Sequence, residues 1–292
     1  MTNVSLDNTL GAFVIGASFA NILFGITCLQ SSFYYRNYPN DGWIFKASVG
    51  IIWVLDTIDV AVTTHVWYFY SIKNFGNFQA FTQGNIVWSF KLHILICVSI
   101  RVFVQAVYAL RLWKLGHHLY QSILWLVILV TASNAGCGIY LVKDVFSIPS
   151  FSQTPTIRNA LISLFAMSIS AEFILSVAMM YTLNKGRTSS VFPNTIAILL
   201  TLMQMVLISG LVTSLYSMLI LVTFLLWPDT LIFLGVDCIQ PKIFINSLLA
   251  MLNARNTVRN IDDSFHLPII DSVAKSVHDH RAEGEVCFSI SI

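Results

Sequence analysis

Seven long apolar stretches, separated by short polar segments, constrain the fold of this chain more than any other feature. Each meets or exceeds the roughly 20 apolar residues that cross about 30 Å of hydrocarbon as a helix. Inside a bilayer the backbone must satisfy its own hydrogen bonds, and stretches this long do so as α-helices. They are Leu10–Tyr34, Ile44–Tyr70, Asn85–Leu110, Leu119–Val142, Asn159–Leu183, Thr195–Leu226 and Thr230–Asn253. The sequence therefore predicts an all-α, polytopic membrane protein, a bundle of seven transmembrane helices.

The composition agrees with a membrane protein and limits what else the chain can be. Hydrophobic residues make up 56%, charged residues only 10%, and the mean hydropathy is +0.75, whereas soluble domains carry roughly 25% charged residues. A net charge of +2 is too small to indicate a nucleic-acid partner. The five cysteines are scattered singly, without the spacing of a metal site or a disulfide framework. We expect no metal, no cofactor and no enzymatic activity.

Basic residues near the helix ends predict the orientation in the membrane. One side collects Arg36, Lys46, Arg111, Lys114, Lys185, Arg187, Arg255 and Arg259, and the other holds Lys73, Lys143 and Arg158. The side richer in Lys and Arg faces the cytosol by the positive-inside rule. We therefore expect a short extracellular N-terminus (1–9), a transmembrane domain (10–259) and a disordered cytosolic tail (260–292).

Charged residues at membrane depth are the sequence feature most able to carry chemistry. A charge at the bilayer centre costs about 2.5–3.5 kcal/mol, so such residues should face the bundle and pair. The candidates for ligand binding or proton relay are Asp56, Asp59, Arg101, Glu172, Asp237 and Lys242. We expect Arg101 to pair with Asp56 or Asp59, which lie at similar depth on the preceding helix.

Uncharged polar residues at similar depth have a simpler interpretation as contacts between helices. These are Asn134, Gln204, Asn246 and Asn253. His65 and His93 lie nearer the outer face and are interpreted as residues of a mouth or interface. Two histidines within helices are too few for an intramembrane zinc hydrolase, which needs about three metal ligands. Pro241 predicts a kink beside Lys242. That lysine alone is a poor match to the Schiff-base lysine of retinal proteins, and no retinal is expected.

The end of the last stretch, Asn246-Ser247-Leu248-Leu249-Ala250-Met251-Leu252-Asn253-Ala254-Arg255, resembles a signature of an uncharacterised family. This family consists of seven-helix proteins from mushroom-forming fungi and is a domain of unknown function. Shorter stretches fit it as well: 25–30, 55–57 and 228–233. The resemblance extends from about Leu6 to Arg259 and implies a fold and a fungal source, but no mechanism.

Three functions are compatible with these observations. The leading hypothesis is a receptor-like or sensory protein with a small-ligand site between helices, because of the helix number, the topology and the polar layer at the midplane. The alternatives are a secondary transporter or proton-coupled carrier, and a structural membrane protein without a ligand, in which the charges only fix helix packing. Expected partners are membrane lipids, a small-molecule ligand and a cytosolic partner at the C-terminal tail. The expected location is the plasma membrane or another membrane of the secretory pathway.

Overall fold

The fold was analysed in a computed structural model that describes residues 11–74, 86–116, 121–150, 157–189, 193–227 and 232–254. The predicted extracellular N-terminus (1–9) and the predicted cytosolic tail (260–292) lie outside the described residues. All described residues lie within the predicted transmembrane domain (10–259).

The described residues confirm the all-α prediction, since each apolar stretch is helical. The elements are α1 (Ala12–Asn37), α2 (Trp43–Tyr68), η2 (Phe69–Lys73), α4 (Trp88–Gly116), α5 (Gln121–Ser147), α6 (Arg158–Ser189), α7 (Pro193–Leu226) and α8 (Ile232–Asp237). A further helix follows α8 over residues 240–254. η2 is a π-helical turn that extends α2.

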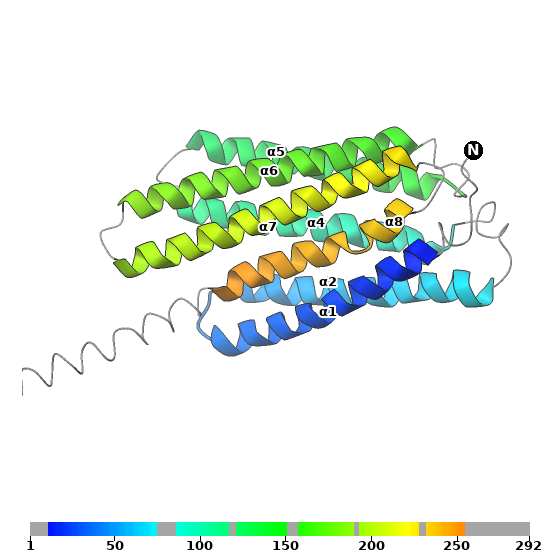
Figure 1. Ribbon diagram of the computed structural model, residues 1–292, viewed down its shortest axis with the longest axis horizontal. Helices are drawn as coiled ribbons and strands as arrows, with labels where there is room; N and C mark the ends of the chain where they lie inside the picture. The colour runs from blue at the N-terminus through cyan, green and yellow to red at the C-terminus, as the bar shows by residue number, and fades with distance from the viewer. Residues whose placement is uncertain are drawn as a thin grey trace, which may run out of the picture.

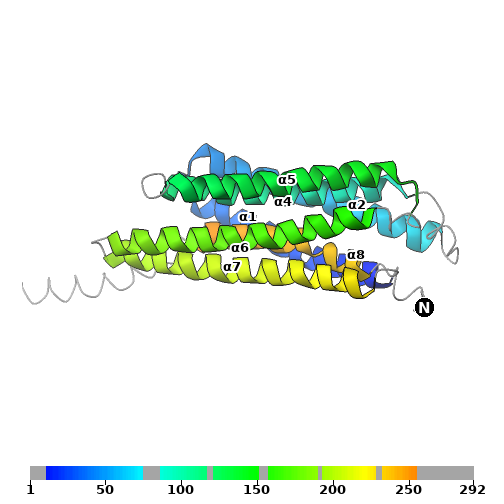
Figure 2. The ribbon, with the colours of Figure 1, turned by 90° about the horizontal axis from the view of Figure 1, so that it is seen from above.

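The helices run side by side along the long axis of the molecule (Figure 1; Figure 2). Consecutive helices alternate in direction, so that α1 begins and α2 ends at the same end of the bundle. We call this the Ala12 end, and the opposite one the Asn37 end. α6 packs along α7, α4 packs against α2, α5 and α6, and α8 packs against α1 and α7.

Six of the described helical segments are long and apolar enough to cross a membrane. They are Ala12–Asn37, Trp88–Trp113, Gln121–Ser147, Arg158–Lys185, Leu207–Leu226 and Ile232–Ala254. Large apolar side chains such as Ile22, Trp125 and Leu215 are exposed on the outside, as expected where the solvent is lipid. The chain is therefore an integral membrane protein. α2, which carries two buried aspartates, is not among the six segments.

The last membrane segment is discontinuous. α8 ends at Asp237, a turn occupies residues 238–239, and the helix resumes at residue 240. Pro241 explains the break, because proline has no N–H to donate to the carbonyl four residues earlier and its ring clashes with that group. The predicted kink is thereby confirmed, and it lies directly beside Lys242.

Two apolar clusters occupy the two halves of the bundle. The first includes Ile52, Val104, Leu183 and Leu248 and fills the half towards the Asn37 end. The second includes Val66, Phe165, Phe224 and Phe233 and fills the half towards the Ala12 end. Asn134 of α5, Glu172 of α6, and Gln240 and Lys242 of the last segment fall between these clusters along their helices. The protein thus has a polar layer enclosed by two apolar regions.

Glycines allow the last segment to approach α1 closely. A Cβ atom at Gly16 would lie 1.9 Å from the carbonyl oxygen of Gly235, and one at Gly235 would lie 2.3 Å from that of Ala12. Both obstacles are backbone atoms, so a side chain could not be accommodated by a change of rotamer. Small residues at such crossings allow the close backbone packing on which membrane helices depend.

We predict that Gly16→Val and Gly235→Val each destabilise the protein by about 1–3 kcal/mol, the usual cost of overpacking. Gly25→Ala and Gly136→Ala are the matched controls, because a Cβ at either position meets nothing within 4 Å. The controls should be neutral or slightly stabilising, since alanine is the better helix former. Thermal unfolding of the purified variants in detergent measures the difference. Equal stability of Gly16→Val and Gly25→Ala would contradict the close contact.

Candidate functional site

The centre of the polar layer is an ion cluster around Lys242. Its Nζ donates hydrogen bonds to Oδ1 of Asp56 and, at 2.9 Å, to Oδ2 of Asp59. Oδ1 of Asp59 lies 2.7 Å from Nδ1 of His93. The four side chains come from α2, α4 and the last segment, and each residue is at most 3% exposed. We call Asp56, Asp59, His93 and Lys242 the Lys242 cluster.

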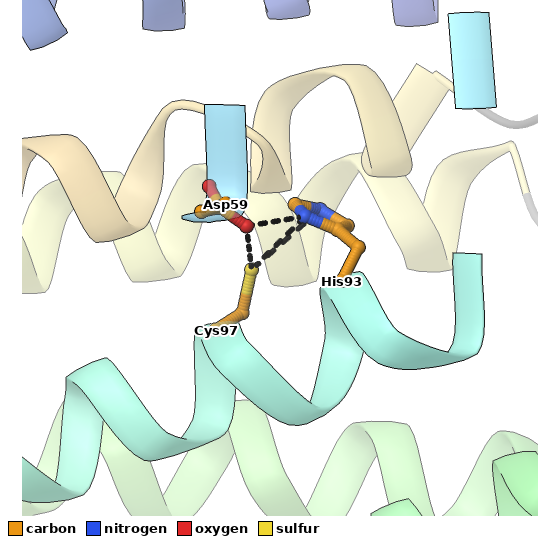
Figure 3. A group of neighbouring side chains, drawn as sticks. All are labelled: Asp59, His93 and Cys97. Atoms are coloured by element: carbon orange, nitrogen blue, oxygen red, sulfur yellow. Dashed lines mark hydrogen bonds and ion pairs between the residues drawn. The ribbon is translucent and has the colours of Figure 1, made fainter. Parts of the chain in front are cut away.

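Two cysteines lie beside His93 and extend this cluster. Cys97 lies one helical turn from His93 on α4, and its Sγ is 3.5 Å from Nε2 of the imidazole (Figure 3). Sγ of Cys238, in the turn after α8, lies 3.8 Å from the same Nε2. One donor atom each of Asp59, His93 and Cys97 lie within 4.8 Å of one another, close enough to hold a metal ion. The sequence did not predict this group, because Asp59 comes from α2 and the other two residues from α4.

The two helical histidines differ in their surroundings. His93 is only 3% exposed, so its interpretation as a mouth residue is wrong. Phe90, one turn before it on α4, belongs to the apolar cluster that covers this part of the helix. His65 is exposed, and its Nδ1 lies 2.9 Å from Oγ of Ser89.

A second polar group, the Arg101 chain, links four elements. Nη2 of Arg101 lies 3.7 Å from Oδ1 of Asp237 and also donates to Oε1 of Gln240. Nε2 of Gln240 donates to Oγ of Ser217 at 2.6 Å, and that hydroxyl donates to both carboxylate oxygens of Glu172 at 3.0 and 3.2 Å. The chain thus runs from α4 through the last segment and α7 to α6.

The predicted pairing of Arg101 with Asp56 or Asp59 is wrong. Among the described residues, the ion pairs of those aspartates are with Lys242 and His93, and the partner of Arg101 is Asp237. Asp59 does face α4, but at His93, which lies about 12 Å along the helix from Arg101. Similar depth on neighbouring helices was therefore not sufficient to identify the partner.

Glu172 lines a cavity of about 30 Å³ in the half of the bundle towards the Asn37 end. Its polar lining also includes Gln105, Tyr108, Ser209 and Thr213. Nε2 of Gln105 has no hydrogen-bond partner among the described residues. The space exceeds what one water molecule needs, and it offers polar partners. The Arg101 chain therefore ends at a site suited to water.

A groove of about 210 Å³ lies between α1 and α2 towards the Ala12 end. Its lining is Val14, Ala17, Ser18, Asn21, Thr63, Thr64 and Trp67. Oγ1 of Thr63 lies 3.2 Å from Nδ1 of His93. The groove therefore reaches the Lys242 cluster, as the cavity reaches the Arg101 chain from the other end.

Three of the four predicted packing residues lie between helices. Asn134 donates to Oε1 of Gln105 at 2.9 Å and accepts from Ser168 at 3.2 Å, which joins α5 to α4 and α6. Asn246 and Asn253 donate to backbone carbonyls of α1, at 3.1 and 2.9 Å. The side chain of Gln204 is exposed, which differs from its expected place between helices.

The sequence identified the six Asp, Glu, Lys and Arg residues of the layer but missed His93 and several uncharged partners. Gln240 and Ser217 complete the Arg101 chain, yet neither carries a charge that would mark it as costly in a membrane. His93 and Cys97 did leave a signal, because residues four apart share one face of a helix. No sequence pattern indicated Cys238, since its contact with His93 depends on the turn after α8.

Comparison with known proteins gives one match. Residues 168–257 are similar to a family of unknown function, DUF6534. The matched region is less than half of the chain and includes Glu172, Ser217, Asp237 and Lys242. Neither the curated proteins nor the solved structures gave a match. The match supports similarity to an uncharacterised domain family, whereas the fungal source and the seven-helix architecture of that family stay predictions.

We predict that Arg101→Met lowers the free energy of unfolding by about 3–5 kcal/mol, because it leaves Asp237 without its cation. Adding Asp237→Asn should recover most of this loss, since both charges are then removed. Combining Arg101→Met with Asp56→Asn should instead change the free energy of unfolding by the sum of the two single effects, within about 0.5 kcal/mol. Denaturant unfolding in detergent provides the values for both double-mutant cycles.

Lys242→Met combined with Asp56→Asn is the positive control for these cycles, because those two side chains are in direct contact. A stronger coupling of Arg101 to Asp56 than to Asp237 would contradict the arrangement.

Proposed function

We propose that the protein is a membrane carrier that passes protons through its buried polar layer, the proton-coupled alternative among the functions considered. The observation behind this proposal is that the layer contains more carboxyl groups than basic side chains. The layer contains the acids Asp56, Asp59, Glu172 and Asp237 and the bases Arg101, Lys242 and His93. Even with every base protonated, four carboxylates face three cations. An unpaired buried carboxylate is costly, so the layer holds a proton or a small cation.

The positions of the groove and the cavity support this function. The groove meets the Lys242 cluster at Thr63, and the cavity meets the Arg101 chain at Glu172. Each lies in a different half of the bundle, beside one of the two apolar clusters. A carrier requires this arrangement, because the central groups must exchange protons with either side while the apolar regions prevent a continuous leak.

The discontinuous last segment gives further support. Broken helices at membrane depth are characteristic of transporters, where they place backbone and side-chain groups at a central site. Here the break separates Asp237, which belongs to the Arg101 chain, from Lys242 in the other cluster. One short segment therefore carries charges of both groups.

A sensory function has less support from the geometry. Small-molecule sites usually have volumes of about 300–1,000 Å³ and a mainly apolar lining. The cavity at Glu172 has about 30 Å³ and the groove about 210 Å³, so both are smaller than such a site. A purely structural layer would need only balanced pairs, which the excess acid does not provide.

We further propose that α2 is a seventh transmembrane span, with the N-terminus outside and the C-terminus in the cytosol. Its 26 residues extend about 39 Å, which exceeds the thickness of the hydrocarbon core. Its charges are turned inward, because Asp56 and Asp59 are buried against Lys242. The orientation rests on the excess of Lys and Arg near the Asn37 end.

We predict that proteoliposomes containing the protein dissipate an imposed pH gradient several-fold faster than empty liposomes. A pH-sensitive dye inside the vesicles reports the rate, with valinomycin and K⁺ holding the membrane potential constant. Glu172→Gln should reduce the rate to that of empty liposomes, because it removes the carboxylate at the cavity.

Asp144→Asn is the matched control for the flux experiment, since Asp144 lies near the end of α5 and belongs to neither polar group. It should dissipate the gradient like the unmodified protein. Equal rates for the unmodified protein and empty liposomes would contradict the proposed function, as would full activity of Glu172→Gln.

For the topology, we predict that a glycosylation acceptor inserted between α6 and α7 (190–192) stays unmodified. An acceptor inserted between η2 and α4 (75–85) should be modified. The first connection follows the basic end of the bundle and should remain cytosolic. Mobility of the two variants before and after glycosidase treatment distinguishes them. Modification at 190–192 would reverse the proposed orientation.

A further inference from the structure

Cys97 and Cys238 each place a thiol beside the imidazole of His93 in the protein interior. Sγ of Cys97 and Sγ of Cys238 lie 3.5 and 3.8 Å from Nε2 of His93. The three residues are 3%, 4% and 2% exposed, so bulk solvent does not compete for the donors. Scattered cysteines in a membrane bundle are usually inert apolar side chains, but two thiols around one imidazole nitrogen form a defined donor set.

The spacing of these atoms suits a tetrahedral ion. A zinc ion binds nitrogen at about 2.0–2.1 Å and sulfur at about 2.3 Å, which places the two ligand atoms about 3.5 Å apart. The two observed separations are close to this value. Cys238 lies in the turn between α8 and residues 240–254, outside a regular helix, so its side chain can adjust to an ion.

Asp59 orients the imidazole as carboxylates do in many metal sites. Its Oδ1 lies 2.7 Å from Nδ1 of His93, which favours the tautomer with the proton on Nδ1 and the lone pair on Nε2. Such an aspartate behind a ligating histidine fixes the ring and raises its basicity. Sγ of Cys97 is also 3.6 Å from Nδ1 and 3.9 Å from Oδ1 of Asp59, so it faces both side chains (Figure 3).

The groove between α1 and α2 supplies a route to this cluster. Thr63 lines the groove, and its hydroxyl contacts Nδ1 of His93 at 3.2 Å. An entry path is one of the requirements for a metal site. Ser18, Asn21 and Thr64 line the same groove and offer oxygen atoms to an arriving hydrated ion.

We propose that His93, Cys97 and Cys238 bind one soft or borderline metal ion of the Zn²⁺ or Cu⁺ class, with Asp59 as the residue that orients His93. Thiolate and imidazole ligands select this class of metal. When Zn²⁺ binds, both thiols lose their protons, so that one ion replaces two protons and the net charge of the layer is unchanged. The test below measures metal binding alone, so its outcome does not depend on whether the protein carries protons.

The test uses the reduced, chelator-treated full chain in detergent, with Co²⁺ as the spectroscopic probe. We expect one Co²⁺ per chain, a thiolate-to-cobalt charge-transfer band in the near ultraviolet, and displacement of that ion by Zn²⁺. Cys97→Ser and Cys238→Ser should each weaken the band and lower the affinity at least tenfold. Asp59→Asn should keep the band and lower the affinity about 10–100-fold.

Cys28→Ser and Cys137→Ser are the matched controls, because both cysteines are free and only half-buried. The variant Cys28→Ser/Cys137→Ser/Cys287→Ser retains Cys97 and Cys238 as its only thiols. It leaves the proposed site intact, so it remains informative if a site variant fails to fold. A full band in this triple variant supports the site. Absence of the band from the unmodified or the triple variant protein overturns it, as does unchanged binding in folded Cys97→Ser or Cys238→Ser.

Discussion

The contact of Lys242 with Asp56 and Asp59 is the interaction on which the rest of the structure depends. Three charged groups, each at most 1% exposed, cannot face lipid, so α2 and the last segment must lie against each other at this depth. Asn246 and Asn253 then hydrogen-bond the last segment to backbone carbonyls of α1. The arrangement of these helices thus follows from one requirement, that no buried charge be left without a partner.

The break in the last segment has a physical cause and a structural use. Pro241 prevents a regular helix through residues 237–241, which would be unfavourable in contact with lipid because unpaired backbone groups are costly there. Within the polar layer the cost is lower, since hydroxyl and amide groups lie nearby: the hydroxyl of Tyr216, for example, donates to the carbonyl of Val236 at 2.9 Å. The layer therefore tolerates the irregular backbone, and the turn in return places Cys238 beside His93.

The sequence predicted the helices well because their cause is local. A stretch of apolar residues longer than the hydrocarbon core specifies a helix whatever surrounds it, and a charge within that stretch specifies an inward face. The partners of those charges are not local. Arg101 and Lys242 could each satisfy the aspartates of α2 as judged by depth, and only the angular positions of α4 and the last segment decide between them. Those angles depend on packing over the whole bundle, including the close approach of Gly16 and Gly235, which leaves no pattern in a single sequence.

The backbone between Asp237 and Lys242 connects the Arg101 chain to the Lys242 cluster. Asp237 and Lys242 lie on either side of the turn at residues 238–239, one bound to Arg101 and the other to the aspartates of α2. Under the proposed carrier function, protonation of Asp237 would weaken its attraction to Arg101, and any resulting movement of the turn would be transmitted to Lys242 through five residues of backbone. The same turn carries Cys238, so an ion bound between the two cysteines and His93 would hold α4 and the last segment together. Movement of protons and binding of a metal would then act on one hinge.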